Sequence, residues 1–599
     1  MDAIFCGNGS LLIQCADAFQ QSGGQLQGVI TADAQIAAWA VAQGIAHLGT
    51  PEAPDLAGAS FDWLFSVANL TVLPKALTQR ARLGAINFHD GPLPGRAGLN
   101  VPVWAILDGA STHAITWHEM LVAVDTGAAL KVRTFDIAPG DTAFSLNASC
   151  YEAGLDSFRE LIAELQAGQQ VRQPLTGARG WYARAKRPEA LATLDFGHSM
   201  AGLDRLMRGL DFGGYANPLA VPKVWTGQRL LAVTRLAMVQ DARGNAGQVL
   251  AADGAGLLVA VADGAVRLSG LMDMTGAAVD AGRLGLRAGQ MLPGVPGADV
   301  GAVGRAEPEW AAALHGANPA LPPYPADHGA GQGQLSTPIN PGNAADDTLL
   351  AAWLAWVCGL TGQETATIAL RGDIPAAPYL SALRPVAVTM GAQTTARTAV
   401  ACVTDARAAA LARAPMAADL CLRMAHPDAR AAAMRALRVV FAQDDGDDLG
   451  HDLEGQADLI LSPNRLIARQ GHFTPATLQA MAAAFDSYLA GFMANLDTVL
   501  ADLPLGAGPS LQGPTLPIPA LRIHQAFAAM VVKTPDAPAL EAGSTKLTYA
   551  ELDARVDALA GALAARGAGP GKIVGLCLER SADLITSMLA MIWKRLILS

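Results

Sequence analysis

Short apolar runs alternate with longer amphipathic segments along residues 1–150. The runs AIFCG, LQGVIT, FDWLFSVANL and GAINFHD are separated by segments such as SLLIQCADAFQQ. Short apolar runs are typical of buried strands, whereas a period of 3.6 residues is typical of helices. The alternation predicts an α/β fold over residues 1–190, with a Rossmann-like and mostly parallel sheet flanked by helices.

The pattern changes from residue 199 onward. A helical segment, MAGLDRLMRGL, is followed by the β-like runs RLLAVTRLAMV, GLLVAVADG and AVRLSGLM, with Gly between them. Short strands at this spacing predict a small, OB-like β-barrel over residues 199–292.

Three further regions follow the predicted barrel. Residues 293–345 are rich in Gly, Pro and Ala, which predicts an extended, weakly packed connector. The connector overlaps the start of a second α/β region over residues 305–505, and a last segment covers residues 520–599. A chain of 599 residues is expected to hold roughly three to five domains, so this division agrees with its length.

Composition indicates the cellular setting. Apolar residues reach 51%, but 62 Gly, 35 Pro and many Ala account for the high mean hydropathy. The chain has no uninterrupted apolar run of about 18 residues, the length that would span a membrane. The start MDAIFCGNGS lacks the basic residues and long apolar segment of a signal peptide. We therefore expect a cytoplasmic protein without a membrane partner.

Charge and cysteine content exclude two further classes of site. The net charge is −11, and no excess of Lys and Arg is present to attract a phosphate backbone, so we expect no nucleic-acid partner. Seven cysteines are scattered without CxxC or Cys/His ligand spacing. Neither a metal site nor a disulfide framework is therefore expected.

The segment AINFHDGPLPGRAG carries the candidate chemistry. Asn87 and His89 lie two residues apart at the end of an apolar run, so in a strand both side chains point to one face, near the carboxyl edge where open α/β sheets bind ligands. Asp125, in VAVDTGAAL, lies further along the chain, where only the fold can bring it to His89. An amide donor, an imidazole and a carboxylate together suit the transfer of a formyl group between nitrogens: the amide stabilises the oxyanion, the imidazole carries the proton, and the carboxylate fixes its tautomer and stabilises the imidazolium.

Taken alone, an Asn-x-His pair is more often structural than catalytic, and a DTG is more often a turn. The order and spacing of three segments, LGAINFHDGPLPGRAG, WAILDGASTHAITWHEM and VDTGAALKVRTFDIAPGDTAFSL, nevertheless resemble the formyltransferase family. This family includes methionyl-tRNA formyltransferase, glycinamide ribonucleotide transformylase and sugar-amine formyltransferases. The resemblance implies that Asn87, His89 and Asp125 occupy the catalytic positions and that the formyl donor is 10-formyltetrahydrofolate.

The resemblance also implies where the folate binds. Its pterin is expected against Leu70, Val72 and Leu73 and the loop leading to Asp125, since apolar residues suit a flat ring. His118, in TWHEM, matches a position that is His in several relatives. It either lines the same pocket or is an ordinary hydrogen-bonded strand histidine.

The acceptor side is indicated less specifically. Gly9 and Ser10, in the loop GNGS, resemble a loop that holds a substrate phosphate in purine-pathway relatives, where backbone N–H groups face an anion at a helix start. A plain strand-to-helix turn explains the same residues. Asp90 stands beside His89 where relatives commonly have a Ser-Leu-Leu-Pro run, so we place Asp90 with Gly9 and Ser10 among the acceptor-binding candidates.

The remaining regions resemble other modules. Residues 199–292 resemble the carboxyl-terminal domain of methionyl-tRNA formyltransferases, and residues 305–505 resemble the second lobe of a condensation domain. Condensation chemistry is not expected, because the chain has no His-His pair. From Ile523 the sequence, with its LTYAEL core, resembles the start of an amino-acid adenylation domain of a nonribosomal peptide synthetase. It then ends in IWKRLILS without a phosphate loop, so we expect a truncated, frameshifted or split-gene product that cannot adenylate and whose last part, about 80 residues long, is poorly packed.

These resemblances imply a formyltransferase that works with other peptide synthetase domains or subunits. The expected acceptor is an amine of an aminoacyl or hydroxy-amino-acid unit, tethered to a carrier protein. A nucleotide-sugar amine and hydrolysis of formyltetrahydrofolate are alternatives. The alternative from another class is a catalytically silent module that docks synthetase subunits.

Overall fold

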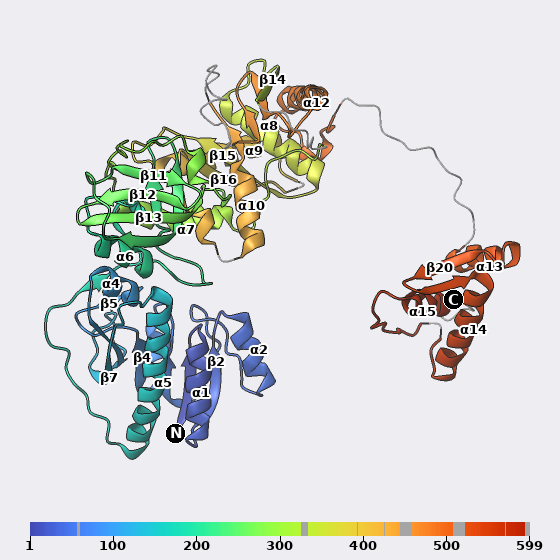
Figure 1. The fold of residues 1–599 in the computed structure, drawn as a ribbon. Helices are drawn as coiled ribbons and strands as arrows, with labels where there is room; N and C mark the ends of the chain where they lie inside the picture. The colour runs from blue at the N-terminus through green and yellow to red at the C-terminus, as the bar shows by residue number, and fades with distance from the viewer. Residues whose placement is uncertain are drawn as a thin grey trace. The chain divides into compact units, whose positions relative to one another are not determined.

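The protein is described by a computed structural model that covers eight stretches of the chain. They are residues 1–56, 60–324, 333–391, 393–424, 426–443, 457–506, 522–569 and 571–592. The chain divides into two compact units, Met1–Ala507 and Gly508–Ser599 (Figure 1). Part of the predicted connector and the final residues 593–599 lie outside the described residues.

The amino-terminal part of the first unit is built on a six-stranded mixed sheet in the order β2-β1-β3-β4-β6-β7. Its strands are β1 (Asp2–Cys6), β2 (Gln25–Ile30), β3 (Phe61–Ser66), β4 (Ala81–His89), β6 (Thr112–Glu119) and β7 (Ala129–Asp136). The pairs among the first four strands are parallel, whereas β4 pairs with β6 and β6 with β7 in antiparallel register. The predicted Rossmann-like sheet is confirmed, with an antiparallel extension at one edge.

Helices cover both faces of this sheet. They are α1 (Ser10–Gln21), α2 (Ala34–Ala42), α3 (Lys75–Thr78), α4 (Val101–Leu107) and α5 (Ala143–Ala167). The helices α1 and α5 lie side by side (Figure 1) and bury a cluster of aromatic rings around Phe5, Phe65 and Phe158. On the opposite face Ile4, Cys6 and Leu64 pack against the segment that contains α3. Side chains alternate between the faces because the period of a strand is two residues.

Two short strands and a turn lead out of the sheet. Strand β5 (Ala97–Gly98) pairs in parallel with β8 (Trp181–Tyr182). The 3-10 helix η1 (Glu189–Ala192) and helix α6 (Met200–Gly209) follow.

The next region is a five-stranded antiparallel sheet in the order β11-β12-β13-β10-β9. Its strands are β9 (Lys223–Trp225), β10 (Leu230–Val239), β11 (Val249–Asp253), β12 (Gly256–Val261) and β13 (Gly264–Met272), and η2 (Ala281–Arg283) follows them. The short strands were predicted, but within the described residues β9 and β11 form the two edges and do not pair to close a barrel. The outer edge of β9 is occupied instead by Thr193 and Leu194, since Leu194 N–H donates to Lys223 O at 2.7 Å.

The second α/β region contains a mixed sheet in the order β14-β19-β18-β17-β15-β16. Its strands are β14 (Gln334–Pro338), β15 (Thr365–Arg371), β16 (Leu383–Thr389), β17 (Val439–Phe441), β18 (Leu459–Leu461) and β19 (Arg465–Arg469). Its helices are α7 (Val300–Leu314), α8 (Asp346–Thr361), α9 (Ala396–Ala412), η3 (Cys421–Arg423), α10 (Pro427–Leu437), α12 (Pro475–Ala494) and η4 (Leu500–Asp502). Trp353, Trp356 and Phe485 form the aromatic centre of its core.

The expectation of a weakly packed connector over residues 293–345 is wrong for its central part. Helix α7 lies inside it, and Trp310 is completely buried in the core of the second α/β region. The run of Ala and Glu residues between the glycines supports a helix, and the tryptophan anchors it.

The second unit is small. It contains α13 (Ile523–Lys533), β20 (Pro538–Ala542), β21 (Thr545–Thr548), α14 (Tyr549–Ala565) and α15 (Ala582–Ile592). Leu547, Val556 and Ala590 belong to its small core, whereas Ile573 is fully exposed. The LTYAEL segment forms the end of β21 and the start of α14, with Thr548 capping the helix. Among the described helices, none is both long enough and apolar enough to cross a membrane.

Candidate active site

Asn87 and His89 lie on β4, at its carboxyl end. Their side chains share one face of the sheet because they are two residues apart, as the sequence predicts. His89 is almost fully buried, at 5% exposure. The apolar residues Ile86 and Phe88, which alternate with them, pack into the core and fix the strand.

The fold brings Asp125 to this strand from the loop between β6 and β7. Its Oδ2 lies 3.8 Å from His89 Nδ1 and accepts a hydrogen bond of 2.9 Å from Gly98 N–H. Asp125 has a φ of 55°, a left-handed conformation that Asp tolerates better than most residues. The turn needs Gly127, since a Cβ there would lie 1.9 Å from Glu119 O. The predicted three residues therefore meet in one cluster.

The backbone holds the imidazole of His89. His89 Nε2 lies 2.7 Å from Arg96 O, and because a carbonyl only accepts, Nε2 carries the proton of the neutral ring. The expectation that Asp125 fixes this tautomer is wrong, since 3.8 Å exceeds hydrogen-bond distance. At this distance Asp125 can act on a protonated His89 only through charge, since two unit charges about 4 Å apart attract by about 4 kcal/mol at an effective dielectric near 20. The free Nδ1 faces both Asp125 and, at 3.9 Å, Asp90.

His118 links Asn87 to Asp125. On β6 it pairs directly with Asn87 across the antiparallel ladder, and its Nδ1 donates to Glu119 O at 2.8 Å. Its Nε2 then accepts from Asn87 Nδ2 at 3.2 Å and lies 3.5 Å from Asp125 Oδ1. His118 is therefore part of the polar cluster. The second N–H of the Asn87 amide has no hydrogen-bond partner among the described residues.

The pKa values of the two carboxylates beside His89 are shifted in opposite directions. Burial raises the pKa of Asp125, but the neighbouring His118 ring, the positive charge of a protonated His89 and the Gly98 N–H outweigh burial and leave this pKa below its ordinary value. Burial is also the main influence on the pKa of Asp90. There its effect exceeds the opposing effect of the charges of His89 and His113, so the pKa is raised. The site thus joins one carboxylate that stays ionised to low pH with one that retains its proton more readily.

The three apolar residues expected against the pterin differ in their surroundings. Leu70 and Val72 are 65% and 74% exposed, on the loop after β3, whereas Leu73 is buried in the core beneath that loop. The sequence-based expectation included the loop leading to Asp125 without naming its residues, and Leu121, Val122 and Val124 are exposed on that loop. The apolar run LVAV, directly before the candidate Asp125, was the signal for them.

Gly9 and Ser10 lie where β1 passes into α1. Gly9 precedes the helix, Ser10 begins it, and no side chain caps it. A Cβ at Gly9 would lie 3.1 Å from the hydroxyl oxygen of Tyr151 and 2.9 Å from Cβ of Ala68. Both residues thus stand at the carboxyl edge of the sheet, next to the loop after β3. In the described part of the chain, no cluster of three or more His, Cys, Asp or Glu side chains could hold a metal ion.

The contacts that hold Asp125 in place were not predicted from the sequence. Gly98 N–H holds the carboxylate, and its strand β5 is held in turn by β8, far along the chain. Gly98 has a φ of +107°, and a Cβ there would lie 2.2 Å from Tyr182 O. The signal in the sequence was the glycine of GRAG after the Asn-x-His motif, but its partner strand of two residues carries no recognisable pattern.

Comparison with known proteins finds two families along the chain. A family model described as "Formyl transferase" matches residues 53–162, and one described as "AMP-binding enzyme" matches residues 527–594. Methionyl-tRNA formyltransferase of Thiobacillus denitrificans is 33% identical over 258 residues, covering 41% of this chain and 79% of that protein. One of the subunits of linear gramicidin synthase, from Brevibacillus parabrevis, is 49% identical over 69 residues, covering 12% of this chain and 1% of that protein.

Among solved structures, the sugar 3N-formyl transferase WlaRD aligns with a TM-score of 0.37 at 15% identity, covering 45% of this chain and 97% of that one. The two family models mark a formyltransferase part and, further along the chain, a segment that matches an AMP-binding enzyme. The match to the curated formyltransferase spans most of that protein, and the family model includes Asn87, His89 and Asp125. The chain therefore belongs to the formyltransferase family.

Proposed function

We propose that the protein transfers the formyl group of 10-formyltetrahydrofolate to an amine of an aminoacyl or hydroxy-amino-acid unit that is tethered to a carrier protein. The observation that carries the proposal is the meeting of Asn87, His89 and Asp125 at the end of β4. The AMP-binding segment on the same chain, and its likeness to part of a gramicidin synthase, support the setting of nonribosomal peptide synthesis.

Exposed apolar residues support the proposed binding of the donor. Leu70, Val72 and Val124 expose apolar side chains on the two loops that follow β3 and β6, which suits a flat heteroaromatic ring. The donor, when bound, supplies a formyl carbon attached to nitrogen. With His118 taking one N–H of Asn87, the second N–H can donate to the formyl oxygen as negative charge develops on it.

The acceptor amine needs a base and a negative environment. His89 Nδ1 is unprotonated in the tautomer set by Arg96 O, so it can take the proton that the attacking amine loses and return it to the departing nitrogen. Asp125 stabilises the resulting imidazolium by charge. Asp90, next to Nδ1, with Gly9 and Ser10 across the same sheet edge, is the proposed contact of the acceptor.

Intact-mass measurement of carrier proteins tests the proposal. The full chain is incubated with 10-formyltetrahydrofolate and a panel of carrier proteins loaded with different aminoacyl units, with His89→Ala as the matched inactive protein. A carrier that gains one formyl group with the wild type, and none with His89→Ala, identifies the acceptor.

The same protein and donor, tested with other acceptors and for formate release, separate the alternatives. Formylation of a nucleotide-sugar amine, with no loaded carrier formylated, would show that the acceptor is a nucleotide sugar. Formate release without any acceptor would indicate a hydrolase. A silent docking module would give neither product. Absence of saturable folate binding in calorimetry up to about millimolar, where sites of about −4 kcal/mol still register, would contradict the formyl donor itself.

A further inference from the structure

Residues 179–187, here called the bridging segment, contact both the candidate active site and the second α/β region. We propose that the second α/β region is a positioning element of the formyltransferase site and acts through this segment. The inference rests on the proposed function, and it adds Arg184, Arg187, Glu307 and Arg423 as positioning residues.

On the side of the site, the bridging segment backs the strand that holds Asp125. Strand β8 pairs with β5, with Gly98 opposite Tyr182, and Gly98 N–H donates to Asp125 Oδ2 at 2.9 Å. Leu99 N–H also donates to Tyr182 O at 2.8 Å. A displacement of β8 would therefore move the N–H group that fixes the catalytic carboxylate.

The same segment holds both loops of the proposed folate pocket. Arg184 Nη2 donates to Leu70 O at 2.8 Å, on the loop after β3. Arg179 Nη2 donates to Val124 O at 2.7 Å, one residue before Asp125. Two arginines of one short segment thus set the spacing of two loops that come from different strands.

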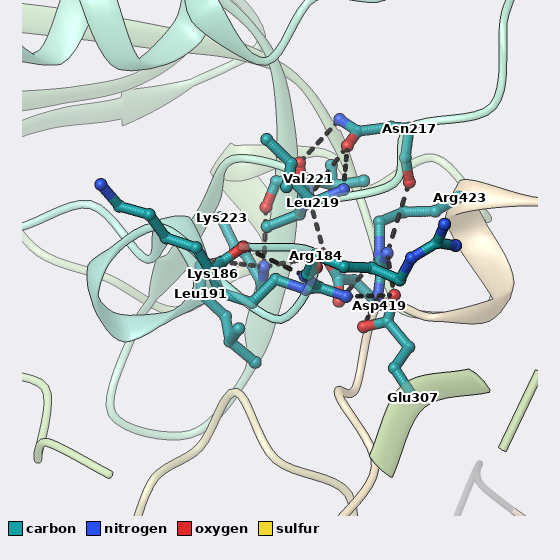
Figure 2. A network of polar contacts seen from close by, with 12 residues as sticks. Arg184, Lys186, Leu191, Asn217, Leu219, Val221, Lys223, Glu307, Asp419 and Arg423 are labelled. Carbon is teal, nitrogen blue, oxygen red and sulfur yellow. Dashed lines mark hydrogen bonds and ion pairs between the residues drawn. The ribbon is translucent and has the colours of Figure 1, made fainter. Parts of the chain in front are cut away.

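On its other side, a buried chain of charges ties the bridging segment to the second α/β region. Arg187 Nη1 donates to Arg184 O at 2.8 Å, and its Nη2 lies 3.0 Å from Glu307 Oε1 on α7. Arg423, in η3, donates two hydrogen bonds, of 2.9 and 2.7 Å, to the carboxylate of the same Glu307. The side chains of Arg187, Glu307 and Arg423 are 5%, 11% and 3% exposed. Figure 2 shows Arg423 and Glu307 meeting beside Arg184.

A second buried pair fixes this arrangement to β9. Asp419 Oδ2 lies 2.9 Å from Lys223 Nζ and accepts from Val221 N–H at 2.6 Å, and both charged side chains are fully buried. Lys223 also donates to Leu191 O and Val221 O (Figure 2). Separating the second α/β region would leave buried charges unpaired, which is strongly unfavourable. The anchor is therefore rigid.

The backbone of α7 also lies in close contact with the backbone of the bridging segment. A Cβ at Gly304 would lie 2.2 Å from Ala185 O, closer than any real Cβ contact, so this glycine lets the helix reach the segment. Near it, Val303 packs in one apolar cluster with Trp104 from the formyltransferase part and Tyr379 from the second α/β region. The site, the segment and the second region thus form one packed assembly. Because misplacing catalytic groups by about 1 Å can lower a rate by about 100-fold, this contact matters for turnover.

Gly304→Ala in the full chain tests the inference, with Gly301→Ala as its matched control. Both glycines lie in α7, and both substitutions raise helix propensity equally. At Gly301 a Cβ would meet only the side-chain ends of Asp299 and Arg305, at 3.2 and 3.4 Å, whereas at Gly304 it meets a backbone carbonyl. The comparison therefore isolates the steric clash of the added Cβ with the backbone of the bridging segment, which only Gly304→Ala introduces.

Two measurements are made on each variant: amide hydrogen exchange of residues 121–127 and 179–187, and kcat and KM for formyl transfer. We expect Gly304→Ala to speed exchange in both stretches and to lower kcat/KM by about 10- to 100-fold, while Gly301→Ala changes neither. Equal exchange and equal kcat/KM in the two variants would overturn the inference. Faster exchange confined to 179–187 would overturn it as well, since the loop of Asp125 would then be independent of the segment.

Hydrogen exchange needs no acceptor, so it decides the inference even where no formylated product is found, and such a result would count only against the proposed function. If Gly304→Ala does not fold, Arg423→Met takes its place, with Arg384→Met as control. Arg384 is a buried arginine of the same region that binds the carbonyls of Ala410 and Leu411. Lower kcat/KM and faster exchange at 121–127 for Arg423→Met alone would support the inference, and equal losses in both would refute it.

Discussion

His89 is oriented by a backbone carbonyl, and two carboxylates that do not hydrogen-bond to it face its other ring nitrogen. Nε2 donates to Arg96 O, so the proton-accepting Nδ1 is directed to the space between Asp125 and Asp90. A carbonyl cannot take the proton away, so the tautomer holds whatever the state of the carboxylates. The carboxylates remain free to stabilise a cation, whether imidazolium or ammonium.

Replacing members of this cluster should lower turnover without weakening the fold. We expect His89→Ala or Asp125→Asn to cost about 10²–10⁴-fold in kcat, because the proton carrier or its charge partner is lost while the apolar folate contacts remain. Asn87→Ala should raise the barrier by about 3–4 kcal/mol if its amide supports the developing oxyanion. Single-turnover rates, with folate affinity from calorimetry, measure both effects. Three folded variants with wild-type rates would place the active site elsewhere.

Asp90→Asn should make the protein more stable at neutral pH. The pKa of Asp90 is raised, chiefly by burial, so its contribution to stability is fully present below the unfolded value near pH 4 and is lost as pH rises through the folded value. The wild type therefore carries at pH 7 a cost that Asn lacks. Urea unfolding across pH 3.5 to 8 measures it. A gain in stability that stays the same at low pH would show that the charge of Asp90 is not its cause.

At the scale of elements, the site is assembled from strands that are distant in sequence. Strand β4 supplies Asn87 and His89, β6 supplies His118, and the two-residue pair β5 and β8 positions the N–H that holds Asp125. Parallel strands end at one edge of a sheet, which explains why the predicted residues converge there. The β5–β8 pair has no alternating hydrophobic pattern. Besides its backbone pairing, the Tyr182 side chain stacks on Trp104 and accepts a hydrogen bond from Arg96.

Gly98→Ala should disrupt this pair. The residue has a φ of +107°, and an added Cβ would lie 2.2 Å from Tyr182 O, so we expect a loss of about 1–3 kcal/mol from backbone strain, together with a marked fall in kcat. Gly95→Ala is the control, because at Gly95 the nearest atom, Pro92 O, is 3.8 Å from the Cβ position. Urea unfolding and turnover are compared for the two. Similar behaviour of both variants would mean that β5 does not position Asp125.

At the scale of the molecule, the formyltransferase part and the second α/β region share buried ion pairs and an apolar cluster. Burial lowers the pKa of Lys223, whereas the charges of Lys223 and Arg423 overcome burial and hold the pKa of Asp419 below its ordinary value. Burial thus opposes the charge of Lys223, and the ion pair with Asp419 compensates for burial in part. The resemblance-based division at residues 293–345 therefore marks a change in composition, but the structure packs tightly across it.

Lys223→Met should destabilise the first unit by about 3–5 kcal/mol, since it leaves the buried Asp419 with only the longer contact to Arg423, at 3.5 Å, in place of its ion pair with Lys223. The double variant with Asp419→Leu should regain much of that loss, because an apolar pair of similar volume needs no compensation. Arg397→Met, which breaks an exposed pair with Asp497, should have a far smaller effect. Denaturant unfolding followed by tryptophan fluorescence compares them. A double variant no more stable than Lys223→Met would show that the loss arises from packing.

Strand periodicity and short motifs are local, because each is written in consecutive residues, and they were enough to predict the Rossmann-like sheet, the face shared by Asn87 and His89, and the family. The surroundings of these residues became visible only in the folded chain. The partner of His89 Nε2 is a backbone carbonyl, the support of Asp125 comes from β5 and β8, and the buried charges join segments about 200 residues apart, as in the bond from Val221 to Asp419. Such contacts depend on which distant backbone atoms face each other after folding, and no local pattern encodes that pairing.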